Sequence, residues 1–149
     1  MTEPSDGNVK QAVPFFLITD MDDSLRFYVD GLGFEMTLKW IKDGAVRWCW
    51  LQRGGAALML QTYRTDDGTS LKPDGVLGLG VSIVFICEDA LALYREFKER
   101  GLDASRPFVG NGMWVTTLQD PDGYRVEFES YTTVPEDTVL EDPAETISQ

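Results

Sequence analysis

The chain has 149 residues, of which 43% are hydrophobic and 26% charged, as is typical of an ordinary water-soluble globular protein. It has no apolar run near the roughly 20 residues that span a bilayer and no signal-peptide pattern at its start, so we expect a cytoplasmic protein without a membrane partner. The 25 acidic and 13 basic residues give a formal net charge of −12, which repels phosphate backbones and argues against a nucleic-acid partner.

The first half of the chain reads as strand, helix and three strands. An apolar strand is predicted over residues 12–18, and a helix follows over residues 24–33. One face of this helix is marked by apolar residues at i, i+3, i+4 and i+7, namely Leu25, Tyr28, Val29 and Leu32. Strands are then predicted over residues 34–41, 45–52 and 56–63. Their apolar positions alternate, as expected for half-buried strands.

Alternation also predicts which tryptophans lie together. In the strand 34–41 it places four side chains on one face, Phe34, Met36, Leu38 and Trp40. In the next strand Trp48 and Trp50 share a face by the period of two. That face either lines a cavity or packs against a helix, and the pattern does not decide between them.

The second half repeats this order. A strand is predicted over residues 81–87 and a helix over 88–101, whose apolar face holds Ala90, Leu93, Tyr94 and Phe97. A short strand within 102–110 and a hairpin of strands 113–119 and 124–131 complete the half. Tyr28 and Tyr94 are 66 residues apart, and Gly31 and Gly101 are 70 apart. This long repeat predicts two βαβββ units; the alternative is an unrepeated α+β domain.

The predicted organisation has five parts. A tail over residues 1–10 precedes the first module at 11–66. A linker loop at 67–79 leads to the second module at 80–131, and an acidic C-terminal tail covers 132–149.

Two motifs resemble a known family. The stretch "ITDMDDSLRFYVDGLGF", residues 18–34, is similar to the opening helix of the vicinal oxygen chelate superfamily. The stretch "LQDPDGYRVEFES", residues 118–130, is similar to its closing hairpin and last strand. That superfamily contains glyoxalase I, extradiol dioxygenases and bleomycin resistance proteins. The resemblance covers roughly residues 11–131 and implies an α+β fold of two tandem βαβββ modules that form an incompletely closed eight-stranded barrel around a cavity.

The resemblance also implies where a metal would bind in the metal-using members. Their four ligand positions correspond here to Val13, Met59, Ser82 and Glu127, with Gln61 as the alternative to Met59. The chain has no histidine, valine cannot coordinate, and a thioether and a hydroxyl are weak ligands for zinc, nickel or iron. We therefore expect no metal cofactor. The sequence argues against glyoxalase and dioxygenase chemistry.

The metal-free, bleomycin-resistance-like branch fits better, because it also has a proline where this chain has Pro14. Members of that branch are dimers that sequester a drug in grooves between subunits without chemistry. The resemblance implies a homodimer that binds an aromatic, cationic, antibiotic-type small molecule by stacking and charge. Trp114 is the preferred stacking residue and Glu127 the preferred acid. The other candidates for ligand binding are Trp40, Trp48, Trp50, Met59, Gln61, Ser82, Phe15 and Phe108.

Several alternatives remain open from the sequence. The tryptophans could fill the core, and Glu127 could pair internally with Arg47 or Arg125, because buried charges are normally paired. Glu129, two residues further along the strand, is expected in solvent. A second hypothesis is an enzyme of the same superfamily, a lyase, isomerase or dioxygenase that depends on a divalent metal or on Glu127. A third is a domain that regulates or scaffolds through its acidic tail.

Overall fold

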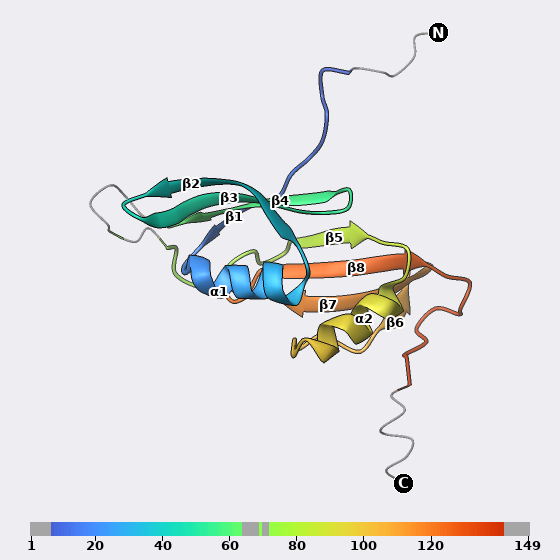
Figure 1. The fold of residues 1–149 in the computed structure, drawn as a ribbon. Helices are drawn as coiled ribbons and strands as arrows, with labels where there is room; N and C mark the ends of the chain where they lie inside the picture. Colours follow the sequence, from blue (N-terminus) through green and yellow to red (C-terminus); the bar gives the residue numbers. More distant parts are fainter. Residues whose placement is uncertain (1–6, 64–68, 70–71, 142–149) are drawn as a thin grey trace.

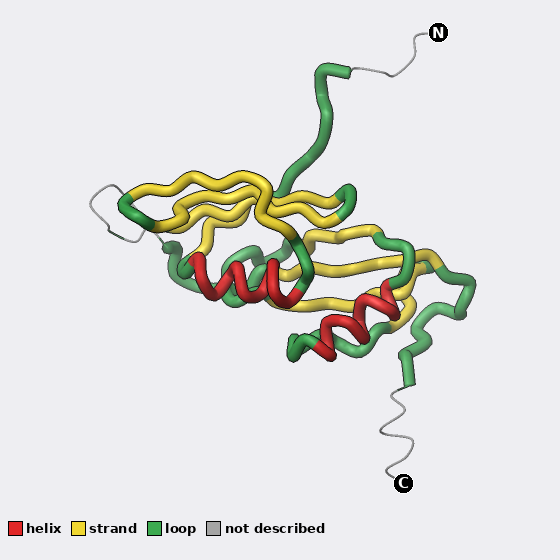
Figure 2. The backbone as a smooth tube through the Cα atoms, in the orientation of Figure 1, coloured by secondary structure: helices red, strands yellow, loops and turns green. Residues whose placement is uncertain are grey.

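The computed structural model describes residues 7–63, 69 and 72–141 (Figures 1 and 2). Its elements follow the order β1 (Phe15–Ile18), α1 (Met21–Leu25), the π-helical turn η1 (Arg26–Gly31), β2 (Glu35–Lys42), β3 (Ala45–Arg53), β4 (Ala56–Thr62), β5 (Ser82–Ile86), α2 (Ala90–Glu99), β6 (Phe108–Gly110), β7 (Met113–Gln119) and β8 (Arg125–Tyr131). The βαβββ order occurs twice. This confirms the predicted α+β fold of two tandem modules.

Each module forms one mixed four-stranded sheet. The strand orders are β1-β4-β3-β2 and β5-β8-β7-β6, so the two modules have the same topology. In each sheet the first strand runs parallel to the last strand of its module, and the other pairs are antiparallel. The sheets do not close into a barrel, which agrees with the expected incomplete closure. Neither helix in the described part of the chain could cross a membrane.

Both helices begin at an aspartate that caps the first turn. The Asp20 side chain accepts a hydrogen bond from the Asp23 backbone N–H at 3.0 Å, and the Asp89 side chain accepts one from the Ala92 N–H at 3.0 Å. These contacts satisfy backbone donors that a helix leaves unpaired at its start. Helix α2 ends before Gly101, whose φ of +83° is the left-handed conformation that favours glycine.

The strand β2 departs from the predicted alternation. Met36 pairs with Leu51, but Leu38 pairs with Trp50, so the strand advances two residues while its neighbour advances one. This irregularity is a β-bulge, and the extra residue reverses the sides on which the following side chains lie. Phe34 and Met36 therefore pack with the core, whereas Leu38 and Trp40 lie on the other face. The prediction that all four share one face is wrong for this reason.

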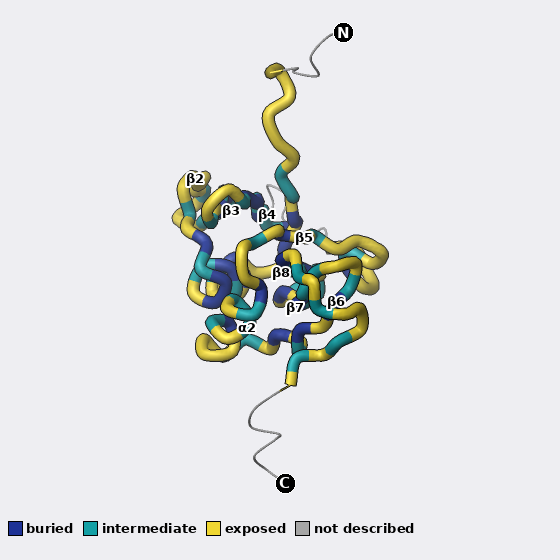
Figure 3. The backbone as a smooth tube through the Cα atoms, turned by 90° about the vertical axis from the view of Figure 1, so that its right-hand side faces the viewer, coloured by how far each residue is buried: buried dark blue, intermediate teal, exposed yellow. Residues whose placement is uncertain are grey.

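The helix-side faces of both sheets join in one hydrophobic core. Phe34 of the first module contacts Phe85 of the second with ring centroids 5.5 Å apart, and Phe16 stacks on Tyr124 at 4.4 Å with an interplanar angle of 6°. Helix α1 lies beneath the first sheet and α2 packs against the second (Figure 1). The buried backbone gathers between these layers (Figure 3). Because this core uses the helix side of each sheet, the opposite side of each sheet points away from it. We call these opposite sides the outer faces.

The turn between β7 and β8 fastens the second module to the first. Within the turn, Asp120 Oδ1 accepts hydrogen bonds from the backbone N–H groups of Asp122 and Tyr124, each at 2.9 Å. Its Oδ2 accepts a bond from the buried Tyr28 hydroxyl at 2.8 Å. Asp122 accepts from the backbone N–H of Thr19 at 3.1 Å. Burial raises the pKa of Asp120, and burial beside this carboxyl raises the pKa of Tyr28 well above its usual value.

An ion cluster makes a second link between the modules. Arg53 of β3 donates to the backbone oxygen of Leu32 at 2.6 Å and to Glu96 of α2 at 2.8 Å. Arg100 donates to the Gly31 oxygen at 3.1 Å and lies 3.2 Å from Glu96. The hydrogen bond from Arg53 lowers the pKa of Glu96. Both arginines also satisfy carbonyl groups where the first helical segment ends.

A short C-terminal segment covers the outer edge of the second sheet. Val109 N–H donates to the Thr138 oxygen at 2.8 Å, and Leu140 N–H donates to the Pro107 oxygen at 2.9 Å. Phe108 and Val139 form an antiparallel bridge. The chain therefore lies along β6 as an additional extended segment.

We expect Tyr28→Phe to lower the free energy of unfolding by about 1–3 kcal/mol, because a buried carboxylate oxygen loses its donor. Removing this donor raises the pKa of Asp120 further in the folded state, so the loss is largest near neutral pH. It shrinks as the pH falls through the carboxyl range, where Asp120 becomes protonated. Urea unfolding at several pH values measures this. Tyr131→Phe, at a side chain that is 77% exposed, is the control, and equal stability of the two variants would contradict the role of the bond.

Candidate functional site

The outer face of the first sheet is covered by large apolar side chains. The strand register places eight residues in two cross-strand rows. The rows are Leu38–Trp50–Met59–Phe15 and Trp40–Trp48–Gln61–Leu17. We call these eight residues the tryptophan face. Six of the residues that the sequence proposed for ligand binding lie here: Trp40, Trp48, Trp50, Met59, Gln61 and Phe15.

The tryptophan face is open to solvent in the described structure. Trp40 is 53% exposed and Leu38 58%, while Trp48 and Trp50 are half-buried. The opposite side of the same strands carries the buried Cys49, so the question left open by the alternating pattern is answered: these tryptophans lie away from the helix. A contiguous apolar patch on a sheet is typical of an interaction surface.

The outer face of the second sheet is polar and acidic. Three rows cross its strands. They are Ser82–Arg125–Gln119, Val84–Glu127–Thr117 and Ile86–Glu129–Val115–Phe108. We call these ten residues the acidic face. Glu127, Ser82 and Phe108, three further candidates from the sequence, lie on it.

Glu127 has an internal partner, which decides between the two arginines that the sequence left open. Arg125 Nε donates to Glu127 Oε1 at 2.9 Å, and the Arg125 Nη2 atom lies 2.9 Å from the same oxygen. The Glu127 side chain is 12% exposed. Arg47 instead lies 3.9 Å from Asp43. The Glu127 charge is thus largely balanced within its own strand.

Glu129 is more affected by its surroundings than the sequence indicated. It is half-buried, and desolvation raises its pKa. Repulsion from Glu127 and a hydrogen bond with that carboxyl raise the pKa further. The expectation of a solvated Glu129 is therefore met only in part, because the residue is partly buried in its row between Ile86 and Val115.

Trp114 lies on the other side of the second sheet. It pairs with Ser130, and the Ser130 hydroxyl accepts a hydrogen bond from the Ala90 backbone N–H at 2.9 Å, where α2 begins. Glu127 pairs with Thr117, an odd number of residues from Trp114 on the same strand. The two side chains therefore lie on opposite faces. The structure does not bring Trp114 together with Glu127 and Phe108, as the sequence-based hypothesis required.

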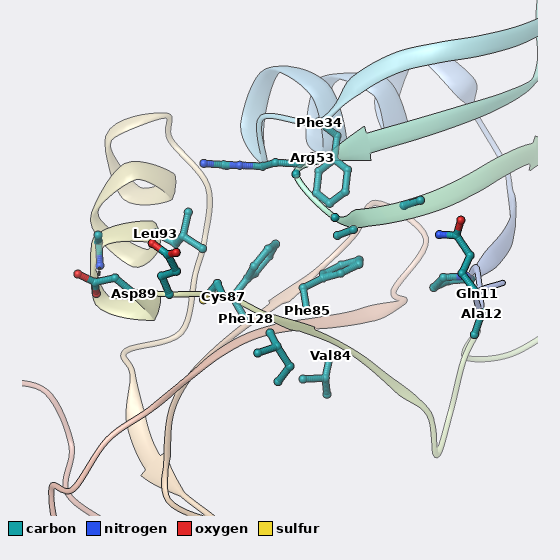
Figure 4. A pocket seen from close by; sticks show the side chains of 18 residues that line it. Gln11, Ala12, Phe34, Arg53, Val84, Phe85, Cys87, Asp89, Leu93 and Phe128 are labelled. Carbon is teal, nitrogen blue, oxygen red and sulfur yellow. Dashed lines mark hydrogen bonds between the residues drawn. The ribbon is translucent and has the colours of Figure 1, made fainter. Parts of the chain in front are cut away.

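A groove of about 980 Å³ lies where the modules meet (Figure 4). Phe34, Phe85 and Phe128 form its apolar part, and Leu93 of α2 and Arg53 of β3 border it. None of the ten predicted ligand-binding residues lines it. Its walls come from segments that are distant in the sequence, so no local pattern could have identified it.

The four positions that a metal would use do not form a coordinating set. Val13 offers no ligand atom, and Met59 lies on the tryptophan face. Ser82 and Glu127 lie on the acidic face in different rows, and Arg125 holds a Glu127 oxygen. Among the described residues no group of three His, Cys, Asp or Glu side chains could hold a metal ion. The residues present do not fit the metal of the metal-using relatives.

Comparisons with known proteins agree with this architecture. One solved structure is a bleomycin-binding protein complexed with bleomycin, which is 23% identical, covers 83% of this chain and 100% of its own, and has a TM-score of 0.62. Another is a bleomycin-binding protein from bleomycin-producing Streptomyces verticillus complexed with copper(II)-bleomycin, with 20% identity, coverage of 83% and 98%, and a TM-score of 0.62.

A third is TnmS3, an antibiotic binding protein from Streptomyces sp. CB03234, with 19% identity, coverage of 83% and 98%, and a TM-score of 0.60. At these identities the similarity shows a common fold. The comparison with curated proteins finds no significant match. The family profile described as "Glyoxalase/Bleomycin resistance protein/Dioxygenase superfamily" matches residues 12–128. The chain therefore belongs to the glyoxalase/bleomycin resistance protein/dioxygenase superfamily.

Proposed function

We propose that this protein is a binding protein that sequesters an aromatic, cationic small molecule of the antibiotic type and leaves it chemically unchanged. The observation that carries the proposal is the tryptophan face, where Trp40, Trp48 and Trp50 lie side by side on an uncovered sheet surface. Planar rings stack well on such side chains, and a cation over a tryptophan ring gains further attraction. The net charge of −12 favours the approach of cations.

We further propose that a second copy of the chain completes the site. Small-molecule sites normally bury most of the ligand surface, and a single open sheet face cannot do this. In the proposed homodimer the tryptophan face of one copy lies opposite the acidic face of its partner, and two-fold symmetry creates two equal grooves. The ligand ring then stacks on tryptophan while its charge meets the acids.

Proteins of similar fold support the proposed binding of an antibiotic-type small molecule. Two solved structures of similar fold are bleomycin-binding proteins and one is an antibiotic binding protein. We propose a cytoplasmic location, which fits the unpaired thiols Cys49 and Cys87. Burial raises the pKa of Cys49 to about 11, so this thiol stays protonated and unreactive at neutral pH.

Trp48→Ala should weaken the binding of a cationic aromatic ligand by about 1–3 kcal/mol, because a stacking surface is lost. Trp114→Ala removes a side chain of the same size from the helix side of the second sheet, and it should not weaken binding. Isothermal titration with bleomycin and a panel of cationic aromatic compounds measures both. Equal affinities of the two variants, or no heat from any compound, would contradict the proposal.

Sedimentation velocity tests the dimer. We expect the natural protein to sediment as a dimer, and Leu38→Glu to convert it to a monomer, because a carboxylate in an apolar interface is costly. Lys39→Glu on the same strand, at an exposed position outside the tryptophan face, is the control and should remain dimeric. A monomeric natural protein would refute the shared site.

Metal titration separates this function from the enzymatic alternative. Protein purified without chelator should contain no stoichiometric divalent ion, and added zinc or nickel should bind without saturating at one equivalent, since one arginine-paired carboxylate is too few ligands. Elemental analysis and calorimetry supply the measurements. One tightly bound ion per chain would favour the metal-dependent enzyme.

A further inference from the structure

One end of the acidic face combines a carboxylate with aromatic side chains. Tyr131 follows Glu129 by two residues on β8 and so lies on the same face. Met113 pairs with Tyr131, and Gly110 pairs with Met113, which makes a fourth row at this end of the sheet. The burial pattern of β8 alternates accordingly, with Tyr131 77% exposed.

The Phe108 ring extends into this fourth row. A Cβ atom on Gly110 would lie 3.0 Å from Phe108 Cε2, so the ring occupies the space that a side chain at Gly110 would need. The antiparallel bridge to Val139 fixes the Phe108 backbone from the other side. The backbone of Phe108 is therefore paired on both sides, with Val115 and with Val139, which limits where the ring can lie.

These side chains have the spacing of a cation site. Tyr131 is on β8 and Gly110 is on β6. These two strands are separated by β7 and are therefore about 10 Å apart. Met113 forms the floor between them. A cation above Met113 would lie about 5 Å from each of the two outer strands, so a ring that stands on either strand can come within the roughly 6 Å of a cation–π contact. Glu129 stands in the next row and closes one side.

Two carboxylates lie at this end of the sheet: Glu129 on the face, and Glu136, which accepts hydrogen bonds from the backbone N–H groups of Asn111 and Gly112. Arg125, the positively charged residue of the acidic face, forms an ion pair with Glu127 at 2.9 Å. Glu127 precedes Glu129 by two residues on β8. Among the described residues the ion pairs of this strand reach Glu127 and not Glu129. Glu129 instead shares a hydrogen bond with Glu127, and burial and this neighbour raise its pKa, so a bound cation would stabilise its charged form.

We propose that Glu129, together with Phe108, Met113 and Tyr131, binds the ammonium group of the ligand and selects a methylated ammonium over a primary one. This inference rests on the proposed function and specifies the ligand's cationic end. Rings and a thioether supply few hydrogen-bond acceptors, so a primary ammonium would lose water around its three N–H donors. A tertiary or quaternary ammonium presents methyl groups to the rings, and the carboxylate balances its charge.

Tetramethylammonium alone tests the subsite without the aromatic part of any ligand. Titration of ¹⁵N-labelled protein should give saturable shifts at the amides of Glu129, Tyr131 and Met113, and ammonium ion at the same concentrations should give at least fivefold smaller ones. Glu129→Gln and Tyr131→Ala should each weaken the tetramethylammonium affinity at least fivefold. Glu99→Gln removes an equal charge from the exposed surface of α2 and should leave it unchanged.

Three results would overturn the inference: equal shifts from the two ions, no saturable shift from tetramethylammonium, or equal losses in Glu129→Gln and Glu99→Gln. The amide spectrum of each variant also shows whether it is folded. Because this titration contains no aromatic ligand, its failure leaves the Trp48→Ala experiment as an independent test of the proposed function. A positive result here with no effect of Trp48→Ala would retain the ammonium subsite and refute stacking on the first sheet.

Discussion

The buried hydrogen bond from the Tyr28 hydroxyl to Asp120 is the constraint on which the arrangement depends. It joins the first helical segment to the turn before the last strand, and the same carboxyl organises that turn through two backbone N–H groups. With the helix sides of both sheets held together, their outer faces must point away from the common core. The turn between β7 and β8, which belongs to the motif at residues 118–130, thus also holds the two modules together.

This packing explains why the two outer faces are uncovered. A barrel closed within one chain would place tryptophans and acids around a single interior cavity. Here the tryptophan face and the acidic face are separated by the core, so each would offer half of the proposed site. Because aromatic surface and negative charge lie on different sheets, the proposed partner copy brings together two properties that neither sheet supplies alone.

Much of this fold could be predicted from sequence because helix and strand periods are local. The apolar spacing of Ala90, Leu93, Tyr94 and Phe97 located α2, and alternation placed Trp48 and Trp50 together. The side of the sheet on which they lie depends on helix packing, which is not local.

Register decided the remaining differences. The bulge after Met36 moved Leu38 and Trp40 to the outer face, and the pairing of Trp114 with Ser130 placed it beside α2. The groove at the module junction, whose walls include Phe34, Phe85 and Phe128, required the tertiary structure altogether.

The segment along β6 has a consequence for how copies of this chain can associate. A sheet border with unpaired backbone groups recruits strands from other molecules, which leads to open-ended polymers. The C-terminal segment pairs with β6, the edge strand of the second sheet, and so blocks the addition of a strand from another molecule there. The proposed dimer, which would form through the faces of the sheets, therefore meets no competing strand pairing at this edge.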